Sequence, residues 1–176
     1  MHKINPKLLE SKCDANQILQ LLIEQNKTIK TFSQDYTGIS ADFSKWSVAQ
    51  HIEHLIYTTK TGIFLLLEAL DNSKSINNMH KLGNELLTKG AFPLKQTQAP
   101  DFSIPKNISH KKLQSSAKRL LSHMQDLSMR ADEINISTTT SAHPVLGGFT
   151  PRNWLQFIAL HQNHHLGIIS ELTDMK

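Results

Sequence analysis

The sequence predicts an all-α fold, a four-helix bundle with one long crossover connection between its second and third helices. Four long stretches carry apolar residues at three- and four-residue spacing, as helices with one buried face do. Only 7 glycines and 6 prolines occur in 176 residues, and three of the prolines lie together in the middle of the chain, where they exclude a continuous helix. A bundle with one long connection satisfies both observations. The length predicts a single domain over residues 1–176.

The first predicted helix begins at about Ala15 and ends near Tyr36. Asp14 stands directly before it, and an aspartate in this place can cap the first free backbone N–H groups of a helix. The apolar residues that define its buried side are Ile18, Leu19, Leu22, Ile23 and Ile29.

The second predicted helix begins at Ser47 and continues through Leu70 to end near residues 71–72. Gln50 stands three residues after Ser47, which is the capping-box pattern of a helix start. The apolar residues of its buried side are Val48, Ile52, Leu55, Leu66 and Leu70.

Residues 73–107 form the long connection. Only residues 79–88, just before Gly90, can form a short helix there. A connection of this length is uncommon inside a compact domain and is often functional. The prolines that exclude a continuous helix in this part of the chain are Pro93, Pro100 and Pro105.

The third predicted helix runs from about Ser109 to Asp132, and the polar Thr- and Ser-rich stretch after it is compatible with a short strand. The fourth helix has Thr150 as its cap and Pro151 at its first helical position, a favoured arrangement, and runs to about Asp174. The buried side of the third helix consists of Leu113, Ala117, Leu120, Leu121, Met124 and Leu127.

The composition argues against several classes of protein. The net charge is +4 and the pI is near 9.2, but the 19 lysines and arginines are scattered and do not cluster with aromatic residues as a nucleic-acid-binding surface requires. The longest apolar run, residues 62–67, is too short to span a bilayer, and the first ten residues lack the apolar segment of a signal peptide. Cys13 is the single cysteine and fits a reducing compartment. We therefore expect a cytoplasmic protein with no membrane and no nucleic-acid partner.

Two histidines of the fourth helix indicate a metal site. His161 and His165 are four residues apart, so their Cβ atoms lie about 6 Å apart and both imidazoles can ligate one ion. A buried imidazole costs free energy unless it has a partner. The alternative is two core histidines that each make one hydrogen bond, and we favour the metal because both lie on the buried side. At about 100° per residue, that side comprises Trp154, Ile158, His161, His165, Ile168 and Leu172.

A third ligand has to come from another helix, and the second helix offers two candidates. His51 lies nearer the centre of the apolar side, and His54 lies at its edge, beside His51 and Thr58. Helical geometry slightly favours His51, but the spacing alone leaves both possibilities open.

Two groups of residues correspond to known motifs. In the first, a Trp46-Ser47 pair at the helix start is followed, eight residues after the tryptophan, by His54-Leu55. The second is His143-Pro144-Val145-Leu146-Gly147, then Trp154, then His161-Gln162-Asn163-His164-His165-Leu166. With these motifs the chain resembles the DinB/YfiT-like superfamily of metalloenzymes over roughly residues 46–172. The closest likeness is to a branch with a Lys-Gly turn, here Lys89-Gly90, and scattered prolines in the middle.

The resemblance implies a four-helix bundle of unusual connectivity, often a homodimer, that binds one divalent metal ion through three histidines. Zinc or nickel is the first expectation, and iron or manganese also accept nitrogen ligands. Carried onto this sequence residue by residue, the ligands are His54, His161 and His165.

Other polar residues are expected beside these ligands without binding the ion. The resemblance leaves His51 as a core residue or a neighbour of the site, and His164 as a residue next to the ligands or in the cleft. Thr58, four residues after His54, offers a hydroxyl to the site. His143 is expected to fix the loop before the fourth helix.

Three neutral imidazoles leave a divalent ion its full charge and an open position, as in catalytic rather than structural zinc sites. The resemblance, which includes thiol-dependent transferases and isomerases, implies a metal-dependent enzyme that activates a low-molecular-weight thiol and transfers it to a small electrophile. A metal-dependent hydrolase is the close alternative. A non-catalytic, stress-associated, dimeric metal-binding protein is another, because no carboxylate stands out as a general base. Substrate selection is expected from residues 73–107 and 143–149.

Overall fold

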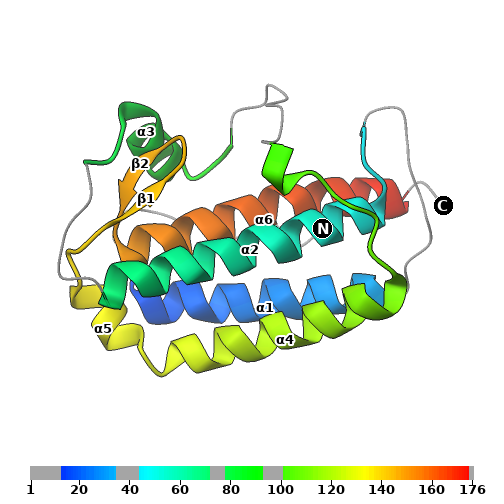
Figure 1. Ribbon diagram of the computed structural model, residues 1–176, viewed down its shortest axis with the longest axis horizontal. Helices are drawn as coiled ribbons and strands as arrows, with labels where there is room; N and C mark the ends of the chain where they lie inside the picture. The colour runs from blue at the N-terminus through cyan, green and yellow to red at the C-terminus, as the bar shows by residue number, and fades with distance from the viewer. Residues whose placement is uncertain (1–12, 35–43, 72–77, 93–100, 175–176) are drawn as a thin grey trace.

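The computed structural model describes residues 13–34, 44–71, 78–92 and 101–174, and four long helices make up most of them (Figure 1). Within these ranges the strands form one small two-stranded sheet, so the prediction of an all-α fold is confirmed. The long helices are α1 (Ala15–Gln34), α2 (Val48–Asp71), α4 (His110–Ser128) and α6 (Pro151–Asp174).

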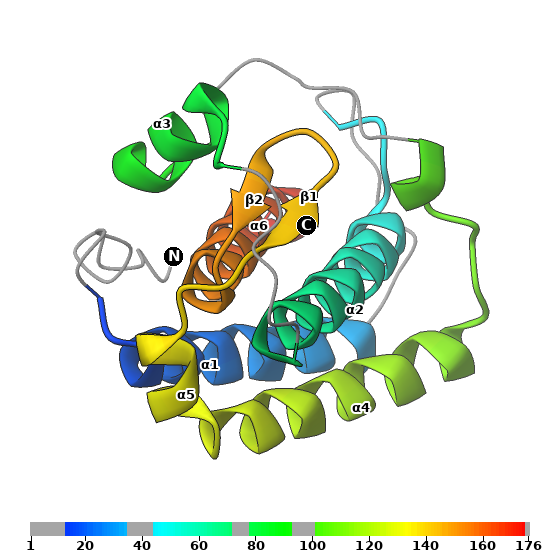
Figure 2. The same cartoon turned by 60° about the vertical axis from the view of Figure 1, so that its left-hand side comes forward.

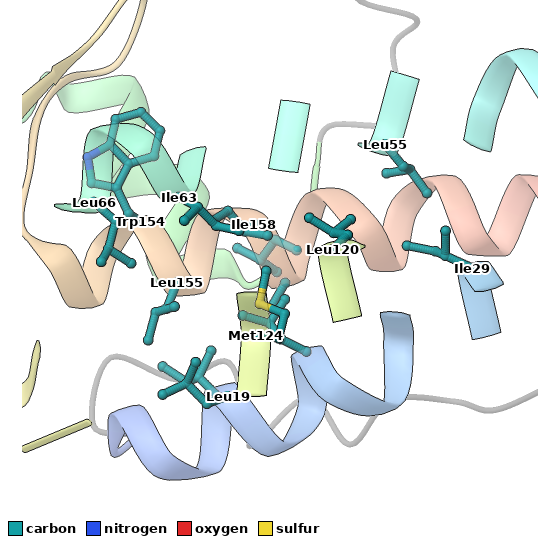
Figure 3. Packing of buried hydrophobic residues seen from close by; sticks show 14 of the residues in the cluster. Leu19, Ile29, Leu55, Ile63, Leu66, Leu120, Met124, Trp154, Leu155 and Ile158 are labelled. Atoms are coloured by element: carbon teal, nitrogen blue, oxygen red, sulfur yellow. The ribbon is translucent and has the colours of Figure 1, made fainter. Parts of the chain in front are cut away.

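The four long helices pack as two antiparallel pairs, α1 with α4 and α2 with α6 (Figures 1 and 2). The α2–α6 pair lies over the α1–α4 pair, and the apolar core fills the space between the pairs (Figures 2 and 3). None of the described helices combines the length and the apolar character needed to cross a membrane. Large side chains that are buried in this core include Leu19, Ile29, Leu55, Leu66, Leu120, Met124 and Trp154.

Helices α2 and α6 come close together where Gly62 faces Ile158. A Cβ atom on Gly62 would lie 2.9 Å from both Cδ1 and Cγ1 of Ile158, which is closer than side chains pack. Gly62 lies about two turns after His54 on α2, and Ile158 lies about one turn before His161 on α6. The contact therefore helps to set the separation of the two helices that carry the candidate ligands.

The side-chain caps predicted for α2 and α6 are present. The Ser47 N–H donates to Gln50 Oε1 at 2.8 Å, and the Gln50 N–H donates to Ser47 Oγ at 3.4 Å, which is a reciprocal capping box. At the start of α6, the Thr150 N–H donates to Asn153 Oδ1 at 3.1 Å and the Asn153 N–H donates to Thr150 Oγ1 at 3.2 Å. Both helices begin within one residue of the predicted position.

Helix α1 also begins where its cap predicts. Asp14 Oδ1 accepts the Asn16 N–H at 2.8 Å, and Asn135, far along the chain, accepts the Ala15 N–H through its Oδ1 at 2.8 Å. The predicted end of this helix, Tyr36, lies outside the described residues.

The prediction of one continuous third helix over residues 109–132 is wrong. Helix α4 ends at Ser128, and a separate short helix, α5, covers Ala131–Ile136. At the break, the N–H groups of Met129 and Arg130 donate to carbonyl oxygens three residues earlier, so the chain tightens and turns. The turn buries Ala131 and Ile134 against the core, which a straight continuation of α4 does not provide. Tertiary burial therefore overrides a local sequence that contains no helix breaker.

The connection between α2 and α4 contains two described helical segments, α3 (Lys81–Lys89) and the 3₁₀ helix η2 (Asp101–Ser103). Helix α3 corresponds to the short helix predicted at residues 79–88 and ends at Gly90 in the left-handed conformation, with φ 62° and ψ 22°. Pro93 and Pro100, part of the argument for this connection, lie outside the described residues.

A small hairpin covers the start of α6. Strand β1 (Ser141–His143) overlaps only the end of the polar stretch that was compatible with a strand, and residues 137–140 of that stretch are not in a strand. It pairs in antiparallel register with β2 (Gly147–Phe149), which was not predicted because three residues are too few to show alternation. The hairpin is joined to the start of α3 by hydrogen bonds from the His80 N–H to Leu146 O at 2.8 Å and from the Gly148 N–H to Asn78 O at 3.2 Å.

Candidate metal centre

Three histidines from two neighbouring helices converge at one point. His54 comes from α2, and His161 and His165 come from α6, which runs antiparallel beside it (Figure 1). One possible ligand nitrogen from each ring lies within 4.8 Å of the other two. His54 and His165 are buried and His161 is partly buried.

The ring of His54 is oriented by a backbone carbonyl. His54 Nδ1 lies 2.8 Å from Ser103 O, and because a carbonyl can only accept, Nδ1 carries the proton and Nε2 does not. Ser103 belongs to a segment that α2 also holds through Glu53, whose carboxylate accepts the N–H groups of Lys106 at 2.8 Å and Ile108 at 3.2 Å. The same turn of α2 therefore supplies a candidate ligand and fixes the segment that orients it.

The ring of His161 is oriented by a hydroxyl. Thr58 Oγ1 lies 3.3 Å from His161 Nδ1 and donates its single proton to His54 O at 2.8 Å. The hydroxyl oxygen can then only accept from His161, so Nδ1 of His161 carries the proton and its Nε2 does not. The expectation that Thr58 lies beside the ligands agrees with this contact.

The two unprotonated nitrogens face each other. His54 Nε2 and His161 Nε2 are 3.2 Å apart, a hydrogen-bond distance with no proton to share between the two lone pairs. Two imidazole nitrogens bound at about 2.0–2.1 Å to one tetrahedral zinc ion are roughly 3.3–3.4 Å apart. The donor set therefore fits a divalent cation, which would compensate the repulsion of the lone pairs.

The third ring, His165, contacts another imidazole. Its Nδ1 lies 2.9 Å from Nδ1 of His51, and Nε2 of His51 lies 2.8 Å from Ser44 Oγ. The structure therefore places His54, and not His51, in the group of three, with His51 outside the group but in contact with His165.

All of these rings are held in the neutral form that binds metals. Burial lowers the pKa of His51 to about 4, and it lowers the pKa of His54 as well. The pKa values of His161 and His165 are lowered further, first by burial and then by repulsion from the neighbouring imidazoles. At neutral pH the group presents lone pairs without any positive charge of its own.

Aromatic rings pack around the group. The Trp46 ring centroid lies 4.8 Å from that of His54 and 6.2 Å from that of His165, against which it stacks. On α6, the Phe157 ring lies 5.9 Å from the His161 ring and is nearly parallel to it, at 7°. The Phe92 ring lies 5.6 Å from His161. These apolar surroundings reduce the screening of any charge placed between the histidines.

Two further histidines named from the sequence lie close by in different roles. His164 is exposed, and its ring meets that of His165 edge-on at 5.1 Å and that of Phe92 at 5.6 Å. His143 accepts the N–H groups of Val145 and Leu146 through Nδ1, each at 3.1 Å, so it fixes the hairpin turn as expected.

Several contacts of the site were not predicted. The carbonyl of Ser103 leaves no signal in a sequence, because every residue has the same backbone group. Ser44 and Phe92 come from segments whose approach depends on the tertiary fold. Glu53 stands one residue before His54, so its closeness to the site can be seen in the sequence. Its role in holding residues 106 and 108 cannot, because it depends on a loop far along the chain.

Comparison with protein families gives a match. A family model described as the DinB superfamily matches residues 31–169, a range that contains all three converging histidines and Trp46. A search among curated proteins finds no match.

Proposed function

The chain belongs to the DinB superfamily, and from this premise we propose that it is an enzyme that holds one divalent metal ion on His54, His161 and His165 and transfers a small thiol to an electrophilic substrate. The observation that carries the proposal is the 3.2 Å separation of His54 Nε2 and His161 Nε2, each on a ring whose other nitrogen already has a partner. Ligand histidines in metalloproteins are typically held in this way by a carbonyl or hydroxyl behind the ring.

The proposed set of three histidines favours an anionic fourth ligand on the metal ion. Three neutral imidazoles add no negative charge, and a divalent ion in such a set lowers the pKa of a bound water to about 7 and deprotonates a bound thiol. Zinc and nickel suit nitrogen ligands best in this proposal, and iron and manganese also accept them. Trp46, Phe92 and Phe157 surround the group with apolar surface, which suits a soft sulfur ligand.

A thiol suits the site better than a water nucleophile because, among the described residues, no carboxylate joins the three histidines. Glu53, the carboxylate nearest to His54 in sequence, is already engaged by two backbone N–H groups. A hydrolase commonly uses a general base beside the metal-bound water, whereas a thiol loses its proton on binding. In this proposal the exposed imidazole of His164, whose ring lies 5.1 Å from that of His165, would take up that proton.

Metal analysis of the purified protein tests the metal centre. Wild-type protein should bind one equivalent of zinc or nickel, and His54→Ala, His161→Ala and His165→Ala should each lose it. His123→Ala, an exposed histidine on α4, is the matched control. Absence of stoichiometric metal in wild-type protein at neutral pH would overturn the proposal, and retention of metal by all three variants would overturn the ligand assignment.

Cobalt substitution tests the thiol. Adding cysteine or glutathione to the cobalt-loaded protein should produce a thiolate-to-cobalt charge-transfer band in the near ultraviolet. A spectrum that does not respond to thiols, together with turnover of a simple ester or amide, would favour the hydrolase instead.

We also propose that the protein acts as a homodimer. Phe64 and Tyr57, both on α2, are 67% and 45% exposed, and large exposed apolar side chains are common at subunit interfaces. Light scattering after size-exclusion chromatography distinguishes a dimer from a monomer.

The alternative is a non-catalytic dimer. A fourth protein ligand that closes the open position of the metal, together with the absence of any turnover, would support it.

A further inference from the structure

The environment of His51 points to a role in setting the tautomer of a metal ligand. His51 is 3% exposed and lies on α2 one turn before His54, yet it stands outside the converging group. Its two ring nitrogens contact His165 Nδ1 at 2.9 Å and Ser44 Oγ at 2.8 Å. Both ring nitrogens of His51 are therefore engaged by neighbours, and one of these neighbours is a candidate ligand.

The direction of these hydrogen bonds follows from the single proton of Ser44. That hydroxyl donates to Trp46 O at 2.9 Å, and a hydroxyl has only one proton to give. Ser44 Oγ can therefore only accept from the nearby ring, so His51 must carry its proton on Nε2. Neutral His51 then has an unprotonated Nδ1, which accepts.

The same reasoning continues to His165. Because His51 Nδ1 accepts, the proton between the two Nδ1 atoms, which are 2.9 Å apart, belongs to His165 Nδ1. A neutral imidazole protonated at Nδ1 has its lone pair on Nε2. His54 and His161 reach the same tautomer through Ser103 O and Thr58 Oγ1.

We propose that His51 is a positioning residue that holds His165 in its Nδ1–H tautomer, through the hydrogen-bond series from His165 to His51, Ser44 and the Trp46 carbonyl, and so keeps His165 Nε2 available for a metal ion. The inference rests on the proposed metal centre and adds a fourth histidine that supports it without binding the ion. Trp46 helps to hold His51 in two ways. Its carbonyl accepts the last hydrogen bond of the series, and its ring centroid lies 5.5 Å from that of His51.

Two substitutions separate the hydrogen bond from the shape of the side chain. In His51→Gln the amide oxygen can accept from His165 and the amide nitrogen can donate to Ser44. In His51→Leu the space is filled with an apolar group that cannot accept. His123→Leu removes an exposed imidazole from α4 and serves as the control.

The first measurement is made on the metal-free wild-type protein. Long-range ¹⁵N–¹H correlation spectra of the histidine rings distinguish Nδ1–H from Nε2–H tautomers. We expect His165 protonated at Nδ1 and His51 protonated at Nε2. A wild-type spectrum with His165 protonated at Nε2 would overturn the inference whatever the variants do.

The second measurement is zinc affinity by chelator competition. His51→Leu should bind zinc roughly 10–100-fold more weakly and show a rise of the Nε2–H form of His165, while His51→Gln stays within a few-fold of wild type. If His51→Leu keeps both the Nδ1–H tautomer and wild-type affinity, His51 is not a positioning residue. If wild-type protein binds no metal, the proposed function fails, and the tautomer spectrum still decides the role of His51.

Discussion

Acidification should destabilise the metal-free protein, because its buried neutral histidines resist protonation. Burial lowers the pKa of His51 and that of His143 to about 4 each, whereas a histidine in the unfolded chain has a pKa of about 6.5. Below about pH 6.5 the unfolded state binds protons that the folded state does not, so the free energy of unfolding falls as the pH falls. The loss begins near pH 6.5 and is complete only below about pH 4.

The size of the effect follows from the pKa difference. At pH 5 the pH lies about 1.5 units below the pKa of a histidine in the unfolded chain and above the pKa of the folded one. Each such histidine therefore lowers the free energy of unfolding by about 2 kcal/mol, at 1.36 kcal/mol per unit. His51 and His143 together therefore remove about 4 kcal/mol of a typical stability of about 5–15 kcal/mol. The lowered pKa values of His54, His161 and His165 act in the same direction.

Urea unfolding of chelator-treated protein, followed by circular dichroism between about pH 7.5 and pH 5, measures this loss. His143→Gln removes one of the groups and should reduce the loss at pH 5 by about 2 kcal/mol. His123→Gln controls for the removal of an exposed imidazole. A change in the wild-type free energy of unfolding of less than about 1 kcal/mol over this range would refute the reasoning.

Three substitutions test other contacts. Thr58→Val removes the acceptor of His161 Nδ1 and should weaken zinc binding roughly 10–100-fold, whereas Thr58→Ser should not; equal affinities would contradict the contact. Gly62→Ala places a Cβ 2.9 Å from Ile158 and should cost about 1–3 kcal/mol in urea unfolding; an unchanged midpoint would show that α6 shifts freely. Ser141→Ala leaves a buried indole N–H without its acceptor and should cost about 1–3 kcal/mol, and a neutral effect on the melting temperature would contradict that.

Features that depend on residues near one another in sequence could be predicted. The starts of α2 and α6 follow from Ser47 with Gln50 and from Thr150 with Pro151, because a cap satisfies backbone groups within one turn. The pairing of His161 with His165 follows from the helical repeat, because residues four apart share a face. The all-α class follows from the same periodicity.

Features that depend on how elements pack were decided by the tertiary structure. His51 and His54 are only about 60° apart around α2, and which of them joins His161 and His165 as a possible ligand depends on the rotation of α2 about its own axis. Packing such as the close contact of Gly62 with Ile158 fixes that rotation, and no local pattern encodes it. The break after Ser128 likewise depends on burial of a later segment.

Some of the chemistry of the site also follows from residues close together in the sequence, and some depends on the packing of distant segments. The sequence by itself determined that two imidazoles lie on one buried face of the last helix, because helical geometry acts over four residues. Helical geometry left His51 and His54 both open as the third ring, and the resemblance carried by Trp46 and His54 named His54. Only the tertiary structure decided the state of all three rings, because the carbonyl of Ser103 and the hydroxyls of Thr58 and Ser44 reach them, directly or through His51, across the fold. A hydrogen-bond partner fixes a tautomer only at contact distance, and contact distance between remote segments is a property of the folded chain.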